Sequence, residues 1–140
     1  PVVRETIQLI SDRIKLKRMR LETHFSTDDC SALLDRDQVK TALLNILVNA
    51  VEAMEEGKGV LVVRTGCTDN SRVYVEVSDN GEGISESVRQ RLFDPFFTGK
   101  SGGMGLGLTA TQNIINSHKG SIEVESQEGK GTTFRLYFPK

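Results

Sequence analysis

The residues from Asp35 to Glu55 constrain the fold more than any other part of the chain, because they predict a long helix with two apolar sides. One side is a continuous apolar face at i, i+3, i+4 spacing, made of Val39, Ala42, Leu43, Ile46, Leu47, Ala50 and Met54. The opposite side carries a second apolar strip, made of Leu44, Val48 and Val51. Both sides need a packing partner, so we expect a sheet under this helix and another helix against it.

Shorter elements flank the long helix, which Asp35 or Asp37 is expected to cap and Gly57 and Gly59 to end. The other helices are expected at residues 3–17, at Gly105–His118 and, as a short helix, at Glu86–Leu92. Strands are expected at Arg20–Ser26, Val60–Thr65, Arg72–Ser78, Ile122–Ser126 and Thr132–Tyr137, and Ala32–Asp35 is compatible with a further short strand.

This order of elements predicts an α+β fold, a two-layer sandwich with about three main helices on one face of a mixed, mostly antiparallel five-stranded sheet. A length of 140 residues suits a single domain over 1–140. The chain begins at Pro1 without an initiator methionine, which favours a fragment of a longer protein.

Composition excludes several kinds of partner. The net charge of −1 leaves no basic excess, so we expect no nucleic-acid binding. No apolar run approaches the ~20 residues that span a bilayer, and Cys30 and Cys67 lack metal-site spacing and are expected to be reduced thiols. We therefore expect a cytoplasmic domain without direct membrane contact, whose parent protein can still be membrane-anchored.

Glycine is concentrated between Asp79 and Leu108, where seven of the thirteen glycines fall. The stretch opens with Asp79-Asn80-Gly81-Glu82-Gly83, passes through Phe93–Thr98 and closes with Gly103–Leu108. Glycine turns bring backbone close to a ligand with little side chain in the way. The stretch therefore predicts a nucleotide pocket and its lid.

Asp79 lies where a predicted buried strand meets the first glycines, which places a carboxylate deep in the expected cleft. A carboxylate accepts hydrogen bonds and the exocyclic amine of adenine donates them, so we assign Asp79 to that amine. Gly83 would let the base approach the backbone. Thr132, on a strand that we expect to be adjacent, would hold a bridging water.

The second glycine cluster precedes a helix, whose free N–H groups and positive dipole end can receive phosphate oxygens. Its glycines are Gly103, Gly105 and Gly107, and Lys100 adds a cation for the terminal phosphate. No Gly-Lys-Ser/Thr follows them, which excludes a Walker-type loop.

Asn45, Asn49 and Glu52 lie at i, i+4 and i+7 along one flank of the long helix. Hard oxygen ligands from one or two side chains suit Mg²⁺ when phosphates and waters supply the others. We assign Asn49 as the Mg²⁺ ligand; the alternative is a hydrogen-bonded polar edge of a packed helix.

Four motifs in order resemble the catalytic ATP-binding domain of two-component sensor histidine kinases. Asn45–Met54 is similar to the family's N box, Asp79–Ile84 to its first glycine box, Phe93–Thr98 to its F box, and Gly103–Leu108 to its second glycine box. The resemblance covers essentially the whole chain and extends to the wider Bergerat-fold group of gyrase B, MutL and the ninety-kilodalton heat-shock chaperones. Within the sensor kinases, the N box looks like that of the nitrogen-regulation subgroup.

The resemblance implies that the domain binds Mg-ATP and transfers the γ-phosphoryl group to a histidine on the dimerisation domain of the same parent kinase, which then supplies an aspartate on a response regulator receiver domain. Asn45 and Asn49 are the implied catalytic residues. Asn45 stands where ATP-hydrolysing members carry a glutamate, which favours phosphoryl transfer over hydrolysis. Implied nucleotide contacts are Asn49, Glu52, Asp79, Gly81, Gly83, Ile84, Phe97, Thr98, Lys100, Gly103, Gly105, Leu106, Gly107, Leu108 and Thr132.

Two departures from the family pattern matter. Many sensor kinases carry a basic residue where this chain has Glu52, so Lys100 must provide more of the phosphate contact. No phosphoacceptor box is present, because His24 and His118 lack its helical His-Glu context, so the domain is expected to be monomeric and inactive in autophosphorylation on its own. The alternatives are an ATP-binding regulatory module, or an ATPase or serine kinase of the same fold.

Overall fold

Three helices and five strands make up the described part of this computed structural model, which comprises residues 2–25, 35–68, 72–84, 86 and 104–139. The helices are α1 (Val2–Leu16), α2 (Arg36–Ala53) and α4 (Met104–Ser117). The strands are β1 (Arg20–His24), β2 (Val60–Cys67), β3 (Arg72–Asp79), β4 (Ser121–Gln127) and β5 (Gly131–Pro139). Each helix and strand confirms a predicted one, with ends shifted by one or two residues in most cases.

The strands form one sheet in the order β1-β2-β3-β5-β4, in which only β1 and β2 are parallel. The predicted mixed, mostly antiparallel sheet is therefore confirmed. β3 and β5 run antiparallel in the centre, and their register places Asp79, the last residue of β3, opposite Thr132 near the start of β5. This pairing confirms the expected adjacency of the two strands.

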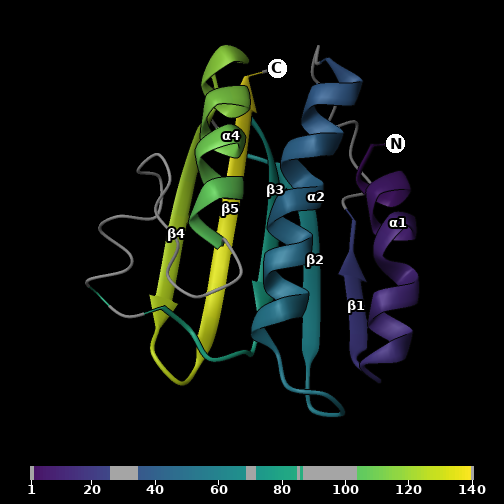
Figure 1. The fold of residues 1–140 in the computed structure, drawn as a ribbon. Helices are drawn as coiled ribbons and strands as arrows, with labels where there is room; N and C mark the ends of the chain where they lie inside the picture. The colour runs from purple at the N-terminus through teal and green to yellow at the C-terminus, as the bar shows by residue number, and fades with distance from the viewer. Residues whose placement is uncertain (1, 26–34, 69–71, 85, 87–103, 140) are drawn as a thin grey trace.

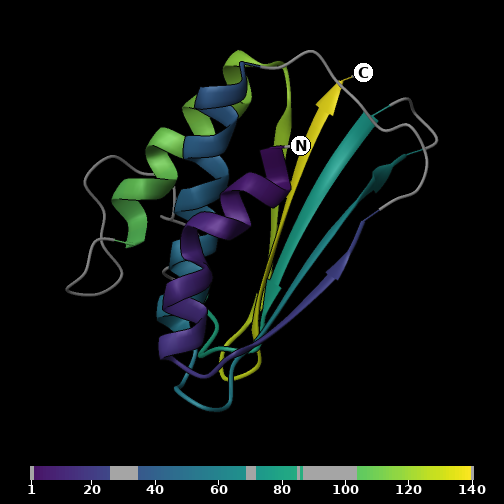
Figure 2. The same cartoon turned by 90° about the vertical axis from the view of Figure 1, so that its right-hand side faces the viewer.

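The three helices cover one face of the sheet, as Figure 2 shows, and α2 lies between α1 and α4 (Figure 1). The main apolar face of α2 is buried, with Val39, Ala42, Leu43, Ile46, Leu47 and Ala50 in the core. On its other side Val51 is buried, and Leu44 and Val48 are partly buried against the same core. Both predicted apolar sides of the helix thus have packing partners.

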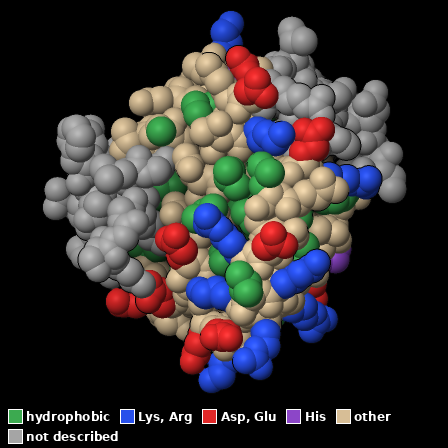
Figure 3. All heavy atoms as spheres, turned by 45° about the vertical axis from the view of Figure 1, so that its right-hand side comes forward, with side chains coloured by type: hydrophobic (Ala, Val, Ile, Leu, Met, Phe, Trp, Pro, Cys, Tyr) green, Lys and Arg blue, Asp and Glu red, His purple; other side chains and the backbone are tan. Residues whose placement is uncertain are grey.

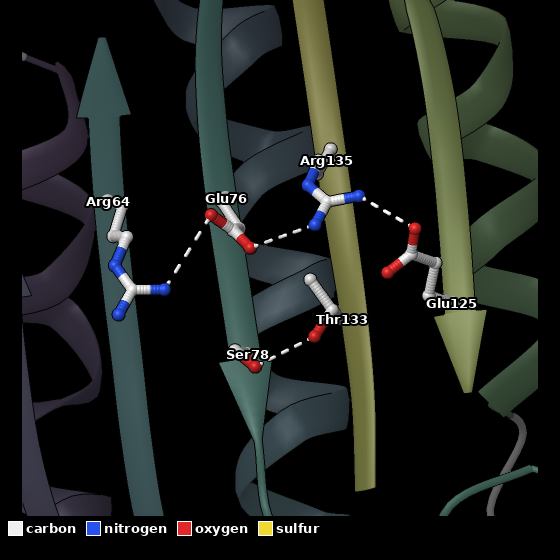
Figure 4. A network of polar contacts seen from close by, with 6 residues as sticks. All are labelled: Arg64, Glu76, Ser78, Glu125, Thr133 and Arg135. Atoms are coloured by element: carbon white, nitrogen blue, oxygen red, sulfur yellow. Dashed lines mark hydrogen bonds and ion pairs between the residues drawn. The ribbon is translucent and has the colours of Figure 1, made fainter. Parts of the chain in front are cut away.

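The opposite face of the sheet is polar. Figure 4 shows Arg64, Glu76, Arg135 and Glu125 in a row across four strands, with the helices behind them. The ion pairs in this row have N–O distances of 3.9 Å (Arg64–Glu76), 3.4 Å (Arg135–Glu76) and 3.0 Å (Arg135–Glu125). Opposite charges on neighbouring strands favour this register, and they leave the apolar side chains of β3 and β5 to the helical side.

On the side of the molecule where α1 lies, the surface carries acidic and basic side chains interspersed with apolar ones (Figure 3). Leu9 and Leu16 of α1 are among the exposed apolar residues. Among the described residues, no helix has the length and apolar character needed to cross a membrane.

Both ends of α2 are held by side chains. Asp35 is the N-cap, and its carboxylate accepts a hydrogen bond from the Gln38 N–H at 3.2 Å. At the other end Lys17 Nζ donates to the carbonyl oxygens of Val51 and Met54, at 2.9 and 3.0 Å. A cation at the C-terminal end of a helix satisfies free carbonyls and favours the helix dipole. The last turn of α2 has no basic residue of its own, so the residue after α1 supplies the charge.

Some sequence predictions are corrected or lie outside the described residues. Cys67 takes part in a disulfide bond, so the prediction of a reduced thiol is wrong for this residue; sequence spacing does not report which thiols a fold brings together. Asp35 caps α2 and is not part of a strand, while residues 32–34 lie outside the described ranges. Of the predicted short helix at Glu86–Leu92, only Glu86 is described.

Candidate nucleotide-binding site

Asp79 is the buried carboxylate at the end of the central strand β3, with 8% of its surface exposed. The Gly81 N–H donates to Asp79 Oδ1 at 2.9 Å, and the backbone N–H of Thr132 also donates to the carboxylate. Burial raises the pKa of Asp79 to about 6, and the two backbone hydrogen bonds oppose that rise. At neutral pH the group is therefore mostly ionised and is an acceptor for a donor on a ligand.

The loop after Asp79 is attached to the neighbouring elements through Asn80. Asn80 Oδ1 accepts from the Val60 N–H at 2.9 Å, and Asn80 Nδ2 donates to the Lys58 carbonyl at 3.1 Å. The next residue but one, Glu82, donates its backbone N–H to the carbonyl of Ala53 at 3.1 Å. These bonds hold the loop against the start of β2 and the end of α2.

Packing within the protein requires the two glycines of this loop. A side chain at Gly81 would collide with the backbone carbonyl of Ala53 at the end of α2. Gly83 has φ +73°, which disfavours other residues, and a side chain there would meet the backbone of Gln127. Protein packing alone therefore explains both glycines, and direct contact of Gly83 with a base stays a prediction.

Ser126 on β4 connects the same loop to β5. Ser126 Oγ accepts from the Ile84 N–H at 2.8 Å, donates to the Gly131 carbonyl at 3.1 Å, and lies 2.9 Å from Thr132 Oγ1. Sequence reasoning missed Ser126, because a serine in a strand has no pattern that marks it. The available signal was its place opposite Thr132 across a predicted hairpin.

The polar flank of α2 has three different environments. Asn45 Nδ2 donates to Thr111 Oγ1 on α4 at 3.5 Å, whereas Glu52 is exposed. Asn49 is 8% exposed, and its Nδ2 atom has no hydrogen-bond partner among the described residues. A buried amide without a partner is costly, so Asn49 does not fit the alternative of a hydrogen-bonded helix edge. The unpaired Nδ2 is a donor and fits an acceptor such as a phosphate oxygen; the assignment of the side-chain oxygen to Mg²⁺ stays a prediction.

The other predicted nucleotide contacts differ in where they lie in the fold. The side chains of Ile84 and Leu108 belong to the hydrophobic core, with 6% and 0% exposed. Gly105, Leu106 and Gly107 lie in the first turns of α4, as the predicted helix start requires. Phe97, Thr98, Lys100 and Gly103 lie outside the described residues.

A hollow of about 640 Å³ adjoins the loop of Asp79 at the end of α2. Its lining residues are Glu52, Ala53, Met54, Glu55, Lys58, Asn80, Gly81, Glu82 and Gly129. Another groove, of about 460 Å³, lies between the start of α2 and the end of α4, where Asp37, Asn113 and Ser117 line it. Only the first hollow includes predicted nucleotide contacts, Glu52 and Gly81.

This arrangement of a buried acid, a glycine loop and an asparagine helix matches a known family. Residues 34–140 match the model described as histidine kinase-, DNA gyrase B-, and HSP90-like ATPase. The chain belongs to this family. Its members share the nucleotide-binding fold that the four motifs predicted.

Curated relatives of the domain are kinases, and several are named as histidine kinases. It is 39% identical over 139 residues to sporulation kinase A of Bacillus subtilis (strain 168). It is 35% identical over 147 residues to the sensory histidine kinase/phosphatase NtrB of Vibrio alginolyticus. The alignments cover 99% and 98% of this chain but 23% and 41% of the relatives, so the domain spans less than half of their length.

Solved histidine kinase structures share the fold. The nucleotide-free catalytic domain of histidine kinase ThkA gives a TM-score of 0.88 at 31% identity, covering 99% of this chain and 90% of that one. Full-length ShkA in complex with AMPPNP gives 0.86 at 27%, covering 99% and 29%. ThkA in complex with response regulator protein TrrA gives 0.83 at 28%, covering 99% and 39%. The domain is thus of the histidine kinase catalytic type.

The raised pKa of Asp79 predicts a pH-dependent stability. Because the folded carboxyl holds its proton up to about pH 6 and the unfolded one only to about 3.8, the free energy of unfolding falls as pH rises through this window. The loss is about 3 kcal/mol by pH 7. Asp79→Asn removes this pH dependence, so the free energy of unfolding of the variant should rise by about 3 kcal/mol relative to that of the parent chain between pH 3 and pH 7.

Urea denaturation of the nucleotide-free domain across this pH range measures the difference. Other titrating groups cancel in the comparison of the two chains. A difference between Asp79→Asn and the parent chain that does not change with pH would contradict the raised pKa.

Proposed function

We propose that the domain binds Mg-ATP and transfers its γ-phosphoryl group to a histidine on a separate dimerisation domain of the parent kinase. Membership of the family supports ATP-dependent histidine kinase chemistry. The observation that carries the proposal is the buried Asp79 carboxylate, held by backbone N–H groups of its own loop and of β5. The likeness to ShkA, which was solved with AMPPNP, supports a nucleotide as the ligand.

Base recognition begins at Asp79. Its carboxylate accepts from the exocyclic amine of adenine, and Thr132, paired with it across β3 and β5, holds the bridging water. The desolvation that raises the pKa of Asp79 also strengthens this hydrogen bond, since few waters compete for the carboxylate. The buried Asp79 carboxylate thus destabilises the nucleotide-free domain and favours the nucleotide-bound one.

Asn49 is the proposed Mg²⁺ ligand, through its side-chain carbonyl oxygen. When bound, the ion neutralises phosphate charge. Nδ2 of the same amide lacks a hydrogen-bond partner among the described residues. When the amide turns toward a metal and phosphates, Nδ2 can donate to a phosphate oxygen. The N-terminal turn of α4, which begins at Met104, offers its free N–H groups to phosphate oxygens.

Phosphoryl transfer needs no general base from this domain. A neutral imidazole nitrogen attacks the γ-phosphorus, the bond to the β,γ-bridging oxygen breaks, ADP leaves, and the ring proton passes to solvent. Catalysis is then mainly positioning and charge neutralisation. Asn45 contacts Thr111 on α4 and joins the two helices that flank the site, consistent with a positioning part in catalysis.

The partners and location follow from this function. We propose that residues 1–140 are one domain of a longer cytoplasmic kinase region, monomeric alone and inactive in autophosphorylation without the histidine-bearing domain. The receiver domain of a response regulator is the proposed downstream partner. The likeness to ThkA, solved in complex with the response regulator protein TrrA, supports this partner class.

Incubation with ATP labelled at the γ-phosphate tests the transfer directly. The domain is mixed with a separately expressed histidine-bearing helix domain, and Asp79→Asn is the negative control. We expect acid-labile label on the helix domain. Free labelled phosphate without protein label would favour an ATPase, and label on a serine would favour a serine kinase. No turnover despite ATP binding would favour a regulatory module.

Replacement of Asn49 tests the metal assignment. Asn49→Ala should abolish most of the gain in ATP affinity that Mg²⁺ provides, because a metal ligand acts only when the metal is present. Loss of the proposed hydrogen bond from Nδ2 to phosphate lowers the affinity with and without Mg²⁺ and so leaves the gain itself unchanged. Calorimetry with and without Mg²⁺ measures both values. Asn113→Ala, at an exposed asparagine of α4, is the matched control. An equal Mg²⁺ gain in Asn49→Ala and the parent chain would rule out the assignment.

A further inference from the structure

We propose that Ser126 is a positioning residue for base recognition: its hydroxyl orients the Thr132 hydroxyl as an acceptor and so sets the preference for an amino-purine base. The inference rests on the proposed nucleotide function and extends it to a residue that does not touch the base. Ser126 lies on β4, directly opposite Thr132 on β5. Asp79 lies opposite Thr132 on its other side, on β3.

One hydroxyl group serves three neighbours. Ser126 Oγ is 2.8 Å from the Ile84 nitrogen, 3.1 Å from the Gly131 carbonyl oxygen and 2.9 Å from Thr132 Oγ1. The three partners belong to the loop after Asp79 and to the first two residues of β5. Ser126 therefore holds together both segments that surround the Asp79 carboxylate.

Counting protons fixes the directions of these bonds. A serine hydroxyl has one proton and two lone pairs. The Ile84 N–H can only donate and the Gly131 carbonyl can only accept, so Ser126 accepts from the first and gives its proton to the second. Its remaining lone pair accepts the proton of Thr132 Oγ1, and all three contacts are then satisfied.

Thr132 has no further proton after this bond, so its oxygen offers a ligand only lone pairs. Asp79, ionised at neutral pH, also offers only lone pairs at its side of the site. Two adjacent acceptors match the donor hydrogens of an exocyclic amine, or of a water fixed beside it. A carbonyl oxygen at the same place, as in a 6-oxopurine, would face two acceptors and lose affinity.

Removal of the Ser126 hydroxyl frees the Thr132 proton. In Ser126→Ala, Thr132 can rotate and donate to a carbonyl oxygen, so the selection against a 6-oxopurine weakens. The same change leaves the Ile84 N–H without this partner, which alone would lower affinity for either base. The ratio of affinities, and not the affinity for ATP alone, therefore reports the positioning role.

Calorimetric titration of the domain with Mg-ATP, and competition with Mg-GTP, tests the proposal. Ser126→Ala should reduce the ATP-to-GTP affinity ratio about tenfold, as expected for one misdirected hydrogen bond in a buried site. Ser126→Thr keeps the hydroxyl and should keep the ratio. In a Thr132→Val background, Ser126→Ala should no longer change the ratio, because the group through which it acts is missing.

Controls separate this role from stability and from the function itself. Ser121→Ala, at the other end of β4, should leave the ratio unchanged, and urea denaturation reports the stability of each variant. An unchanged ratio in Ser126→Ala, or an equal change in the Thr132→Val background, would overturn the inference. If Ser126→Ala fails to fold, an unchanged ratio in Thr132→Val alone would overturn it. Failure of the parent chain to bind Mg-ATP would instead overturn the proposed function.

Discussion

The burial of one carboxylate shapes the rest of the site. Asp79 ends the central strand inside the sheet-helix interface, where desolvation raises its pKa to about 6. Its charge is tolerated because backbone N–H groups of Gly81 and Thr132 point at it. Those groups are in place only when the loop is folded onto α2 and β5 lies beside β3, so strand order and loop geometry both serve this interaction.

The surrounding structure positions this acid through ordinary packing. α2 is buried on two sides, and Lys17 neutralises the end of the helix against which the glycine loop rests. Asn80 and Ser126 attach the loop to β2 and to β4. A domain that places an ionised acid and the unpaired amide of Asn49 in one region gives up some stability when it is empty, as ligand-binding sites often do. In the proposed function, a nucleotide with its metal would satisfy both groups.

Hydrophobic periodicity predicted the helices, the strands and the two buried sides of α2, because these depend on local spacing. Asp79 and Thr132 were predictable as a pair once the strands were placed. The contact of Lys17 with Val51 and that of Ser126 with Ile84 were not predictable, since these partners are 34 and 42 residues away in the sequence. The disulfide of Cys67 escaped prediction because sequence spacing does not show which thiols a fold brings together. Contact of Gly81 and Gly83 with a nucleotide stays a prediction, because packing against Ala53 and Gln127 explains both glycines without a ligand.

The central claim is that the ionised form of Asp79 recognises the base. Carbon-13 NMR of labelled aspartate carboxyl groups, with the Asp79 signal assigned by its loss in Asp79→Asn, measures the pKa of this one group. We predict a value near 6 in the empty domain and a lower value with saturating Mg-ATP, because a donated hydrogen bond favours the charged form. An unchanged or higher pKa with nucleotide would show that the base is bound in another way.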